Sequence, residues 1–397
     1  MIDELLRETG NCINCGFCEA ACPTLPAFDY RASFGARGRI NLAREFLSGR
    51  RELEYLDFFE SCLSCYACYA VCPAGVNAGR VSEIMKEMIA DGHLGHRRSP
   101  VADMIVRVTV KYMDPLGLDE RELTQWAEGI EFDEDSGVIL YTGHMYQLMP
   151  YARKLKDMLL RLGPMSGPLA RIAAIEPSLV KMARGLKDRE LKSRMDGYLR
   201  RIALLLKRKG LRFNYLGRDE PYPGTLILDL GYVSEFRRYA ERVVEIFRSR
   251  GVETIVTVDP HTYDLLINKY PEYVRGFDFE VKHYLDYVDP EDLVKGDRRI
   301  TLHEPCHFVR HTEYDRPRKL LEERYRLVLP AHSGRNTYCC GGPIEFLYPG
   351  SSEKIARRRL KELRDTGAEL AVTACPICYS NLFAEGYVAD IPELLNV

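Results

Sequence analysis

The sequence contains no long apolar segment, no strong charge of either sign and no sign of export. No run among its 397 residues approaches the roughly 20 apolar residues that a membrane-spanning helix needs. The first ten residues, MIDELLRETG, carry acidic side chains and no apolar core, so they do not resemble a signal peptide. The net charge of −2 predicts no nucleic-acid surface and no polybasic membrane patch. We therefore expect a cytoplasmic protein that reaches the inner face of a membrane only through a partner.

Nucleotide-binding motifs and spare cysteines are also missing. No G-x-G-x-x-G follows an expected strand and no G-K-[ST] loop occurs, so the sequence predicts no bound nucleotide and no hydride acceptor. All 13 cysteines fall in metal-like motifs, and none remains for a structural disulfide. This usage favours a reducing compartment. With 46% hydrophobic residues, the chain can bury a core and divide into two or three domains.

Eight cysteines form two copies of one motif, NCINCGFCEAACP at 11–23 and SCLSCYACYAVCP at 61–73. In C-x-x-C-x-x-C-x-x-x-C-P, three thiolates ligate one iron–sulfur cube and the fourth ligates the cube of the other copy. Zinc ribbons and disulfides are alternatives, but zinc sites use paired Cys-x-x-Cys knuckles without a third cysteine and a Cys-Pro. We therefore assign one [4Fe–4S] cluster to Cys12, Cys15, Cys18 and Cys72, and a second to Cys62, Cys65, Cys68 and Cys22.

Helices are expected around these cysteines. Apolar spacing predicts a helix in 34–50, entered after Gly38, and another over 81–89. Arg37 and Arg39 could donate to cluster sulfurs or to carboxylates of a partner; solvated charge at a helix start is an equal alternative. His93 and His96 resemble ligands, but eight thiolates already serve the two clusters, so we expect both histidines on the surface.

From residue 137 the pattern becomes an alternation of strands and helices, which predicts parallel, right-handed βαβ units. We divide the chain into a two-[4Fe–4S] ferredoxin domain (1–98), a connector (99–136) and two α/β domains (137–290 and 291–397). The expected strands are 138–141, 225–230, 253–258, 300–303 and 369–373. The expected helices are 151–162, an insert within 168–209, 234–249, one from 262, 316–323, 352–365 and one from about 379.

The two α/β domains are copies of one unit. GVETIVTVDPHTY at 251–263 aligns with GAELAVTACPICY at 367–379, and VILYTGHM around His144 aligns with ITLHEPCH around Cys306. Only the second copy carries cysteines. The first has His144 in place of Cys306, Tyr222-Pro223-Gly224 in place of Cys339-Cys340-Gly341, and Asp259 and Thr262 in place of Cys375 and Cys378. Its His144, Asp259 and His261 could hold zinc or iron, but we expect a scaffold.

The second copy predicts a third metal site. Its cysteines follow strands, at the edge where open α/β sheets bind ligands. Five thiols are one more than a cubane needs, so either one thiol is free for substrate or all five hold a cluster of unusual shape. A cubane with an accessory thiol and a zinc site are the alternatives. His303, His307 and His311 flank this site; His307 or His303 could hydrogen-bond a sulfur or relay a proton, and packing around the site is the plainer reading. The five thiols are those of Cys306, Cys339, Cys340, Cys375 and Cys378.

With these motifs in view, the chain resembles CCG-domain iron–sulfur subunits. These are the iron–sulfur subunits of glycolate oxidase, anaerobic glycerol-3-phosphate dehydrogenase and D-lactate dehydrogenases, and the HdrD-type subunits of heterodisulfide reductase. GARGRI at 35–40 is similar to the segment between the cysteine triples in the glycolate oxidase branch. The resemblance implies an α+β multi-domain fold: a helical two-cluster ferredoxin module, then two α/β CCG domains with parallel sheets, the first degenerate. In heterodisulfide reductases the complete motif holds a noncubane [4Fe–4S] cluster that cleaves a disulfide, and this implies the same cofactor for the five thiols.

Three functions fit the residues. In the first, the chain is an electron-transfer subunit of an anaerobic oxidoreductase. It would carry electrons between a flavoprotein dehydrogenase, acting on a small hydroxy acid or glycerol-3-phosphate, and a quinone, a membrane subunit or a thiol/disulfide carrier. In the second, the five cysteines and His307 reduce a disulfide. In the third, zinc in the cysteine site makes the chain a binding or scaffold protein.

Overall fold

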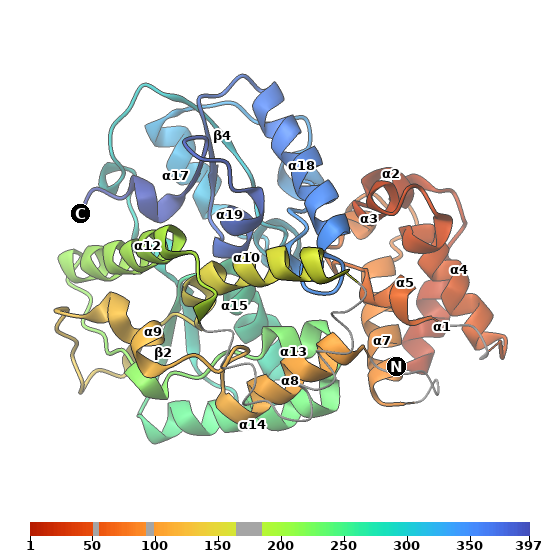
Figure 1. Cartoon of the computed structure of the whole chain (residues 1–397), viewed down its shortest axis with the longest axis horizontal. Helices are drawn as coiled ribbons and strands as arrows, with labels where there is room; N and C mark the ends of the chain where they lie inside the picture. Colours follow the sequence, from red (N-terminus) through yellow and green to blue (C-terminus); the bar gives the residue numbers. More distant parts are fainter. Residues whose placement is uncertain (51–54, 93–98, 164–184) are drawn as a thin grey trace.

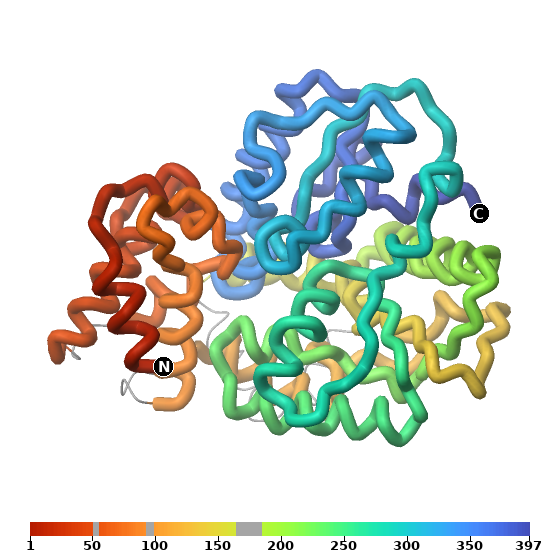
Figure 2. The backbone as a smooth tube through the Cα atoms, turned by 180° about the vertical axis from the view of Figure 1, so that it is seen from behind, coloured from red at the N-terminus to blue at the C-terminus, as the bar shows by residue number. Residues whose placement is uncertain are grey.

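The computed structural model describes residues 1–50, 55–92, 99–163 and 185–397. A helical N-terminal module lies at one side, and two units that each contain a parallel sheet are stacked beside it (Figure 1). The view from behind shows the same three parts, with the first residue in the helical module and the last at the far side of the sheet units (Figure 2). No helix within the described ranges is both long and apolar enough to cross a membrane.

The N-terminal module is built from short helices around a small core of its own. Gly38 lies inside α4, which begins at Ala36, two residues before the predicted entry. A Cβ on Gly38 would lie 1.8 Å from the carbonyl oxygen of Ala32, so only glycine allows this helix to pack on the preceding turn. The predicted apolar face over 81–89 is buried in α7, and Asn77 caps that helix by accepting from the Arg80 amide. The helices are α1 (Ile2–Asn11), α2 (Phe17–Ala21), α3 (Thr24–Ala27), α4 (Ala36–Leu47), α5 (Leu56–Glu60), α6 (Ala67–Ala70) and α7 (Ala78–Ala90).

The segment after the module covers the lower face of the first sheet unit (Figure 1). Helix α8 (Pro100–Tyr112) is capped by the Ser99 side chain and packs against α13. Helix α9 (Glu120–Thr124) follows. The single tryptophan, Trp126, is buried and packs its ring against Tyr215 at a centroid distance of 4.8 Å. This segment is therefore packed against the first sheet unit along its length.

We call residues 138–292 the first sheet unit and 299–394 the second. Apart from the edge strands β3 and β5, the strands of both are mostly buried, as expected of parallel strands with helices on their faces. The first unit contains β1 (Val138–Tyr141), α10 (Met145–Leu162), α12 (Arg189–Arg208), α13 (Thr225–Asp229), α14 (Val233–Ser249), β2 (Thr254–Thr257), α15 (Pro260–Asp264), the π-helix η6 (Leu265–Lys269), α16 (Tyr270–Tyr273) and β3 (Glu280–His283). The second contains β4 (Arg299–Leu302), the π-helix η9 (His307–Thr312), α17 (Arg316–Arg324), β5 (Arg326–Leu327), α18 (Pro349–Asp365), β6 (Leu370–Thr373), α19 (Pro376–Leu382) and β7 (Val388–Asp390).

The sheets of the two units have the same strand order. The first runs β1-β2-β3 and the second β5-β4-β6-β7, and every pair is parallel. Strand β5 adds to the outer side of β4, and in the first unit Asn214 makes a parallel bridge to Ile139 at the equivalent edge of β1. The repeat visible in the sequence is thus present in the topology.

One predicted strand is wrong. Residues 225–230, read as a strand because TLILDL is continuously apolar, form helix α13 over Thr225–Asp229. Gly224, the residue before this helix, has a φ of 90°. The prediction failed because a short apolar run does not distinguish a strand from a buried helix. Strands β3, β5 and β7 were not predicted. They are two to four residues long, and β3 and β5 are exposed edge strands.

Helices α10 and α12 lie between the two sheet units (Figure 1). Helix α10 packs on both α18 and α19 of the second unit, and Tyr146 donates a 2.9 Å hydrogen bond to Asp390 at the end of β7. The predicted helix over 151–162 is the second part of α10, which begins at Met145. Of the predicted helical insert 168–209, the described part is α12, while 168–184 lie outside the described residues. His93 and His96 also lie outside them.

Candidate metal centres

The two cysteine loops of the N-terminal module share one backbone conformation. In the first loop the φ angles of Asn14 and Gly16 are 57° and 86°, and in the second those of Ser64 and Tyr66 are 47° and 55°. Positive φ angles on both sides of the middle cysteine curl each loop around it. Each loop therefore turns its three thiols toward a common centre.

Each loop borders a cavity lined by four thiols. Three thiols come from the loop itself, and the fourth comes from the Cys-Pro step of the other loop. These sets are the ones predicted from the motif as cluster ligands, and the cluster assignment stays a prediction. The first cavity is lined by Cys12, Cys15, Cys18 and Cys72, and the second by Cys22, Cys62, Cys65 and Cys68.

The donor set of these cavities fits iron–sulfur clusters. Burial raises the pKa of the Cys18 thiol to about 12, and the negative charge of Glu19 and of neighbouring thiolates adds to the effect. The Cys18 thiol therefore needs a bound cation nearby to become a thiolate at neutral pH. Soft thiolate ligands suit iron–sulfur clusters, which therefore match both cavities.

Arg39 and Arg37 have different surroundings. The buried Arg39 guanidinium donates to the Cys22 sulfur at 3.8 Å, and also to Thr24 and Ser61 at 3.0 Å each. It thus lies beside the second cavity, in the position predicted for a donor to cluster sulfur. Arg37 borders the first cavity, but its guanidinium pairs with Glu19 at 2.8 Å and donates to no sulfur that the structure describes.

The five cysteines of the second sheet unit come together. All five side chains are buried. The Cys378 and Cys340 sulfurs are 3.3 Å apart, the Cys339 thiol contacts those of Cys306 and Cys340, and the Cys375 thiol contacts that of Cys378. Gly341 has a φ of 90°, and a Cβ on Gly342 would lie 2.3 Å from the Ile377 side chain. These glycines let the loop bring two adjacent cysteines against the start of α19.

His303 is held with one ring nitrogen toward these sulfurs. The buried Arg359 donates from Nε to Nδ1 of His303 at 3.1 Å. Burial lowers the pKa of His303, so the ring is neutral and carries its proton on Nε2. One ring nitrogen of His303 and the sulfurs of Cys340 and Cys378 lie within 4.8 Å of one another, while Nε2 has no hydrogen-bond partner among the described residues. His303 therefore lies beside these sulfurs, and its predicted role as a hydrogen-bond donor to sulfur stays a prediction.

The thiol of Cys65 links the second cavity to the five-cysteine site. It contacts the Cys339 thiol, and the hydrogen bond from Cys339 holds the pKa of Cys65 below its ordinary value. Arg310 joins the two loops around this contact: its Nε donates to the Cys65 carbonyl, and its Nη1 donates to those of Arg335 and Thr337 at 3.1 and 2.7 Å. The second cavity and the five-cysteine site therefore adjoin each other.

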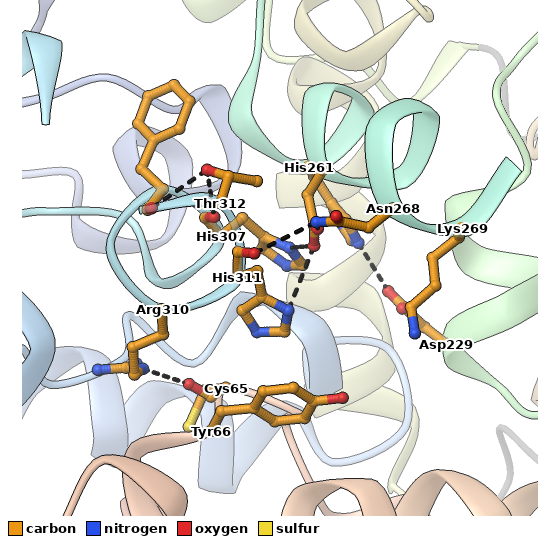
Figure 3. Close-up of polar contacts among 12 residues, drawn as sticks. Cys65, Tyr66, Asp229, His261, Asn268, Lys269, His307, Arg310, His311 and Thr312 are labelled. Atoms are coloured by element: carbon orange, nitrogen blue, oxygen red, sulfur yellow. Dashed lines mark hydrogen bonds and ion pairs between the residues drawn. The ribbon is translucent and has the colours of Figure 1, made fainter. Parts of the chain in front are cut away.

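His307 contacts a carboxylate rather than a sulfur. Its Nδ1 is 2.7 Å from Oδ2 of Asp264, and Nδ1 of His311 is 3.3 Å from the same oxygen (Figure 3). Burial and the nearby His261 cation lower the pKa of His307 to about 4. Burial also lowers the pKa of His261, but its ion pair with Asp229 outweighs this and raises the pKa to about 9. The predicted role of His307 as a donor to sulfur has no contact that supports it.

The equivalent positions of the first sheet unit are filled by polar side chains. Nδ1 of His144 is 3.1 Å from Oδ2 of Asp114, and Asp259 caps α15 by accepting from the His261 and Thr262 amides at 2.9 Å each. Cys375 caps α19 in the same way, through its sulfur and the Cys378 amide. His144 and His261 hydrogen-bond separate carboxylates, so the structure does not bring His144, Asp259 and His261 together as a ligand set.

Four charged residues at these centres were not predicted. Arg310 lies between His307 and His311 in the sequence, and its position between two candidate residues could have identified it as part of the site. Asp114, Asp264 and Arg359 lie in segments with no cysteine or repeat motif, and only the tertiary structure brings them to the site. They contact His144, His307 and His303 respectively.

Comparisons with known proteins agree with this geometry. Residues 8–76 match the family model described as a 4Fe-4S dicluster domain, and 300–383 match the one described as a cysteine-rich (CCG) domain. The chain is therefore an iron–sulfur protein of mixed helical and parallel-sheet architecture, with a dicluster domain followed by a CCG domain. It is similar to CCG-domain iron–sulfur oxidoreductase subunits, as its motifs predict.

Its relatives cover different parts of the chain. It is 22% identical to the HdrD-type subunit of the dihydromethanophenazine:CoB–CoM heterodisulfide reductase of Methanosarcina acetivorans, over 95% of this chain and 89% of that protein. It is 30% identical to the EtfAB:quinone oxidoreductase of Syntrophomonas wolfei over 48% of this chain and 29% of that protein. It is 31% identical to the glycolate oxidase iron-sulfur subunit of Escherichia coli over 31% of this chain and 28% of that protein. The matches span less than a third of the length of several curated relatives.

Proposed function

We propose that the chain is an electron-transfer subunit of an oxidoreductase complex. Cys12, Cys15, Cys18 and Cys72 would hold one [4Fe–4S] cluster, and Cys22, Cys62, Cys65 and Cys68 a second. Cys306, Cys339, Cys340, Cys375 and Cys378 would hold a third, of noncubane type. When bound, these clusters supply one-electron redox chemistry at three places along the chain.

The observation that supports this proposal is the contact between Cys65 and Cys339. The Cys65 thiol of the second cavity interacts with the Cys339 thiol of the CCG site, and Arg310 joins both loops through their carbonyl groups. Burial around this contact excludes water from the path. Such an arrangement suits electron movement between two centres, whereas a scaffold protein has no need of it.

The proposed partners follow from the relatives' names and from the chemistry that this chain does not supply. The sequence has no nucleotide or flavin motif, so a flavoprotein dehydrogenase would oxidise the organic substrate. One relative is named for glycolate oxidase and another for quinone. We infer a small hydroxy acid or glycerol-3-phosphate on the donor side. A quinone, a membrane subunit or a thiol/disulfide carrier would lie on the acceptor side. The domain boundaries 1–98, 99–136, 137–290 and 291–397, with the first α/β domain as a degenerate CCG copy, belong to the same proposal.

The test uses the cluster-loaded protein and the variant Arg310→Met. Reduced methyl viologen is mixed anoxically with the protein, and the third centre is followed by freeze-quench electron paramagnetic resonance. We expect full iron content and at least about tenfold slower reduction of the third centre in the variant, since the two loops lose their shared donor. Arg335→Met, which removes an exposed ion pair with Glu313, is the matched control. Equal rates in all three proteins, or oxidation of glycolate by the chain alone, would contradict the proposal.

A second candidate function is reduction of a disulfide at the CCG site. The convergence of five thiols favours it, since one thiol exceeds the need of a cubane, as does the full-length similarity to a heterodisulfide reductase component. Each disulfide would take up two electrons from the partner and two protons, giving two thiols. Addition of a dithiol should then perturb the paramagnetic resonance of the oxidised third centre, and Cys340→Ser should abolish the response. A spectrum that dithiol leaves unchanged counts against this function.

A further inference from the structure

A group of one carboxylate and two imidazoles lies outside the thiol sites. Asp264, at the end of α15 in the first sheet unit, faces His307 and His311 on η9 of the second. Figure 3 shows the two histidine rings side by side beneath His261, with Arg310 turned away toward Cys65. All three side chains are largely buried, with exposed fractions of 7% for Asp264, 16% for His307 and 9% for His311. No cysteine takes part in this group.

The distances between the ligand atoms fit a bound transition metal. Nδ1 of His307 and Nδ1 of His311 are 2.7 and 3.3 Å from the same carboxylate oxygen. Ligand atoms about 2.1 Å from one ion, at tetrahedral or octahedral angles, are about 3.0 to 3.4 Å from each other. One nitrogen or oxygen atom from each of the three residues lies within 4.8 Å of the others. Only small side-chain shifts would admit an ion between them.

The surroundings hold these ligands in place. Asn268 donates to the second oxygen of Asp264 at 2.6 Å and to the His311 carbonyl at 3.2 Å, so one amide orients two of the ligands. Hydrogen bonds of this kind from outside the ligand set are a regular feature of metal sites. Nε2 of His311 is buried and has no hydrogen-bond partner in the part of the chain that the structure describes. The histidines are four residues apart on a π-helix, a rare conformation that occurs often at functional sites.

The ring contacts connect this group to all three parts of the chain. His311 stacks on Tyr66 of the second cysteine loop at a centroid distance of 4.3 Å, and His307 stacks on His261 of the first sheet unit at 4.1 Å. Tyr66 follows Cys65 and His307 follows Cys306. An ion bound here would therefore join the two sheet units beside the contact between Cys65 and the CCG site.

We propose that Asp264, His307 and His311 form a binding site for a divalent first-row transition-metal ion that joins the two sheet units next to the CCG cysteines. Two imidazoles and one carboxylate suit Fe²⁺, Mn²⁺ or Zn²⁺, whereas the thiol sites prefer softer iron–sulfur chemistry. The site is independent of the proposed electron-transfer role, because none of its ligands is a cluster ligand.

Manganese is the probe of choice, because Mn²⁺ favours oxygen and nitrogen ligands and competes poorly for thiolates. The cluster-loaded full chain is titrated anoxically with MnCl₂, and free Mn²⁺ is counted from its paramagnetic resonance. We expect one Mn²⁺ per chain, displaced by one equivalent of Zn²⁺. Asp264→Asn and His311→Gln should each weaken binding at least about tenfold while iron content stays at the wild-type level. His332→Gln, which alters an exposed histidine–carboxylate pair with Glu362, should bind as the wild type does.

Three results would overturn the proposal. The first is binding of less than a tenth of an equivalent by the wild type. The second is equal binding by the wild type and Asp264→Asn, which would place the ion elsewhere. The third is binding lost equally in His332→Gln. If either Asp264→Asn or His311→Gln loses its clusters, Mn²⁺ binding by the other variant still tests the proposal, since the two residues lie on different elements of the fold.

Discussion

The first and second sheet units differ in the side chains that follow their strands, while their strands and turns remain alike. Gly224 and Gly341 have the same φ of 90°, and Asp259 and Cys375 cap equivalent helices. In the second unit these positions carry thiols that contact one another. In the first they include the Asp259 carboxylate and the His144 imidazole, each with a hydrogen-bond partner, and the Thr262 hydroxyl, which has none among the described residues. The comparison shows that the backbone which gathers ligands is stable without them, because capping and burial, rather than metal, hold it.

The largest expected difference between the units is in metal content. Cys378→Ser should lower the iron content from about 12 to about 8 atoms per chain, at four per [4Fe–4S] cluster. Its counterpart in the first unit, Thr262→Ala, removes a buried hydroxyl without a partner and should leave iron unchanged. Anoxic iron and sulfide analysis of both variants measures this. Equal iron in Cys378→Ser and the wild type would mean that the CCG site holds no cluster.

The next difference is a pH dependence at one pair of equivalent positions, Glu220 in the first unit and Thr337 in the second. Burial raises the pKa of Glu220 to about 7 from an ordinary value of 4.5. The folded state therefore holds a proton that the unfolded state releases between pH 4.5 and 7, and stability falls as pH rises through this window. The loss is at most about 3.5 kcal/mol, from about 1.4 kcal/mol for each pH unit.

Glu220→Gln replaces the titrating carboxyl group with an amide and tests whether the stability of the wild type falls as pH rises. The variant should gain stability relative to the wild type as pH increases from 4.5 to 8, measured as the shift in the urea midpoint. Thr337, the counterpart of Glu220 in the second unit, has no ionisable group, so Thr337→Val should show no such trend. A constant difference between Glu220→Gln and the wild type across the range would show that Glu220 does not titrate as described.

Replacing Gly224 or Gly341 by alanine should lower the free energy of unfolding by different amounts, and this difference between the units is smaller. Alanine at either position is strained by the positive φ. A Cβ on Gly341 would also lie 2.8 Å from the Ser352 carbonyl, which is backbone and cannot move aside, whereas one on Gly224 would meet the Tyr239 ring at 3.0 Å. We expect Gly341→Ala to cost about 2–3 kcal/mol and Gly224→Ala about 1–2 kcal/mol. Urea denaturation of both variants checks the order, and a larger cost for Gly224→Ala would be inconsistent with it.

The smallest expected effect is on the helix cap of the first unit. Asp259→Ala removes the acceptor of two amides and should cost about 1 kcal/mol, whereas Asp259→Asn keeps an acceptor and should recover most of it. Neither change should alter the iron content, because the first unit has no thiols. Loss of iron in Asp259→Ala would show that the first unit supports a cluster after all.

The sequence was sufficient for features that depend on local chemistry. The cysteine spacing predicted the grouping of thiols around both cavities, since three ligands of each set lie on one short loop. The aligned repeat predicted two parallel sheets. The apolar run 225–230 was wrongly predicted as a strand, because the turn at Gly224 that precedes helix α13 cannot be seen in the apolar pattern. Edge strands such as β3 are too short and too polar to recognise.

The contacts between the three parts could not be predicted in this way. Arg310 and Cys65 are 245 residues apart, and Asp264 and His307 are 43 residues apart. Neither pair shares a motif, and no periodicity relates one to the other. Such contacts depend on how the units pack, which one sequence alone does not determine.

Cys15 is exposed, while all five CCG cysteines are buried. Oxidants in solution act first on accessible sulfur. Air should therefore damage the protein in a fixed order, starting at the outer loop of the N-terminal module and reaching the CCG thiols last. With three clusters bound as proposed, a briefly aerated sample would keep the colour of the CCG centre after losing the outer cluster and the electron transfer that depends on it.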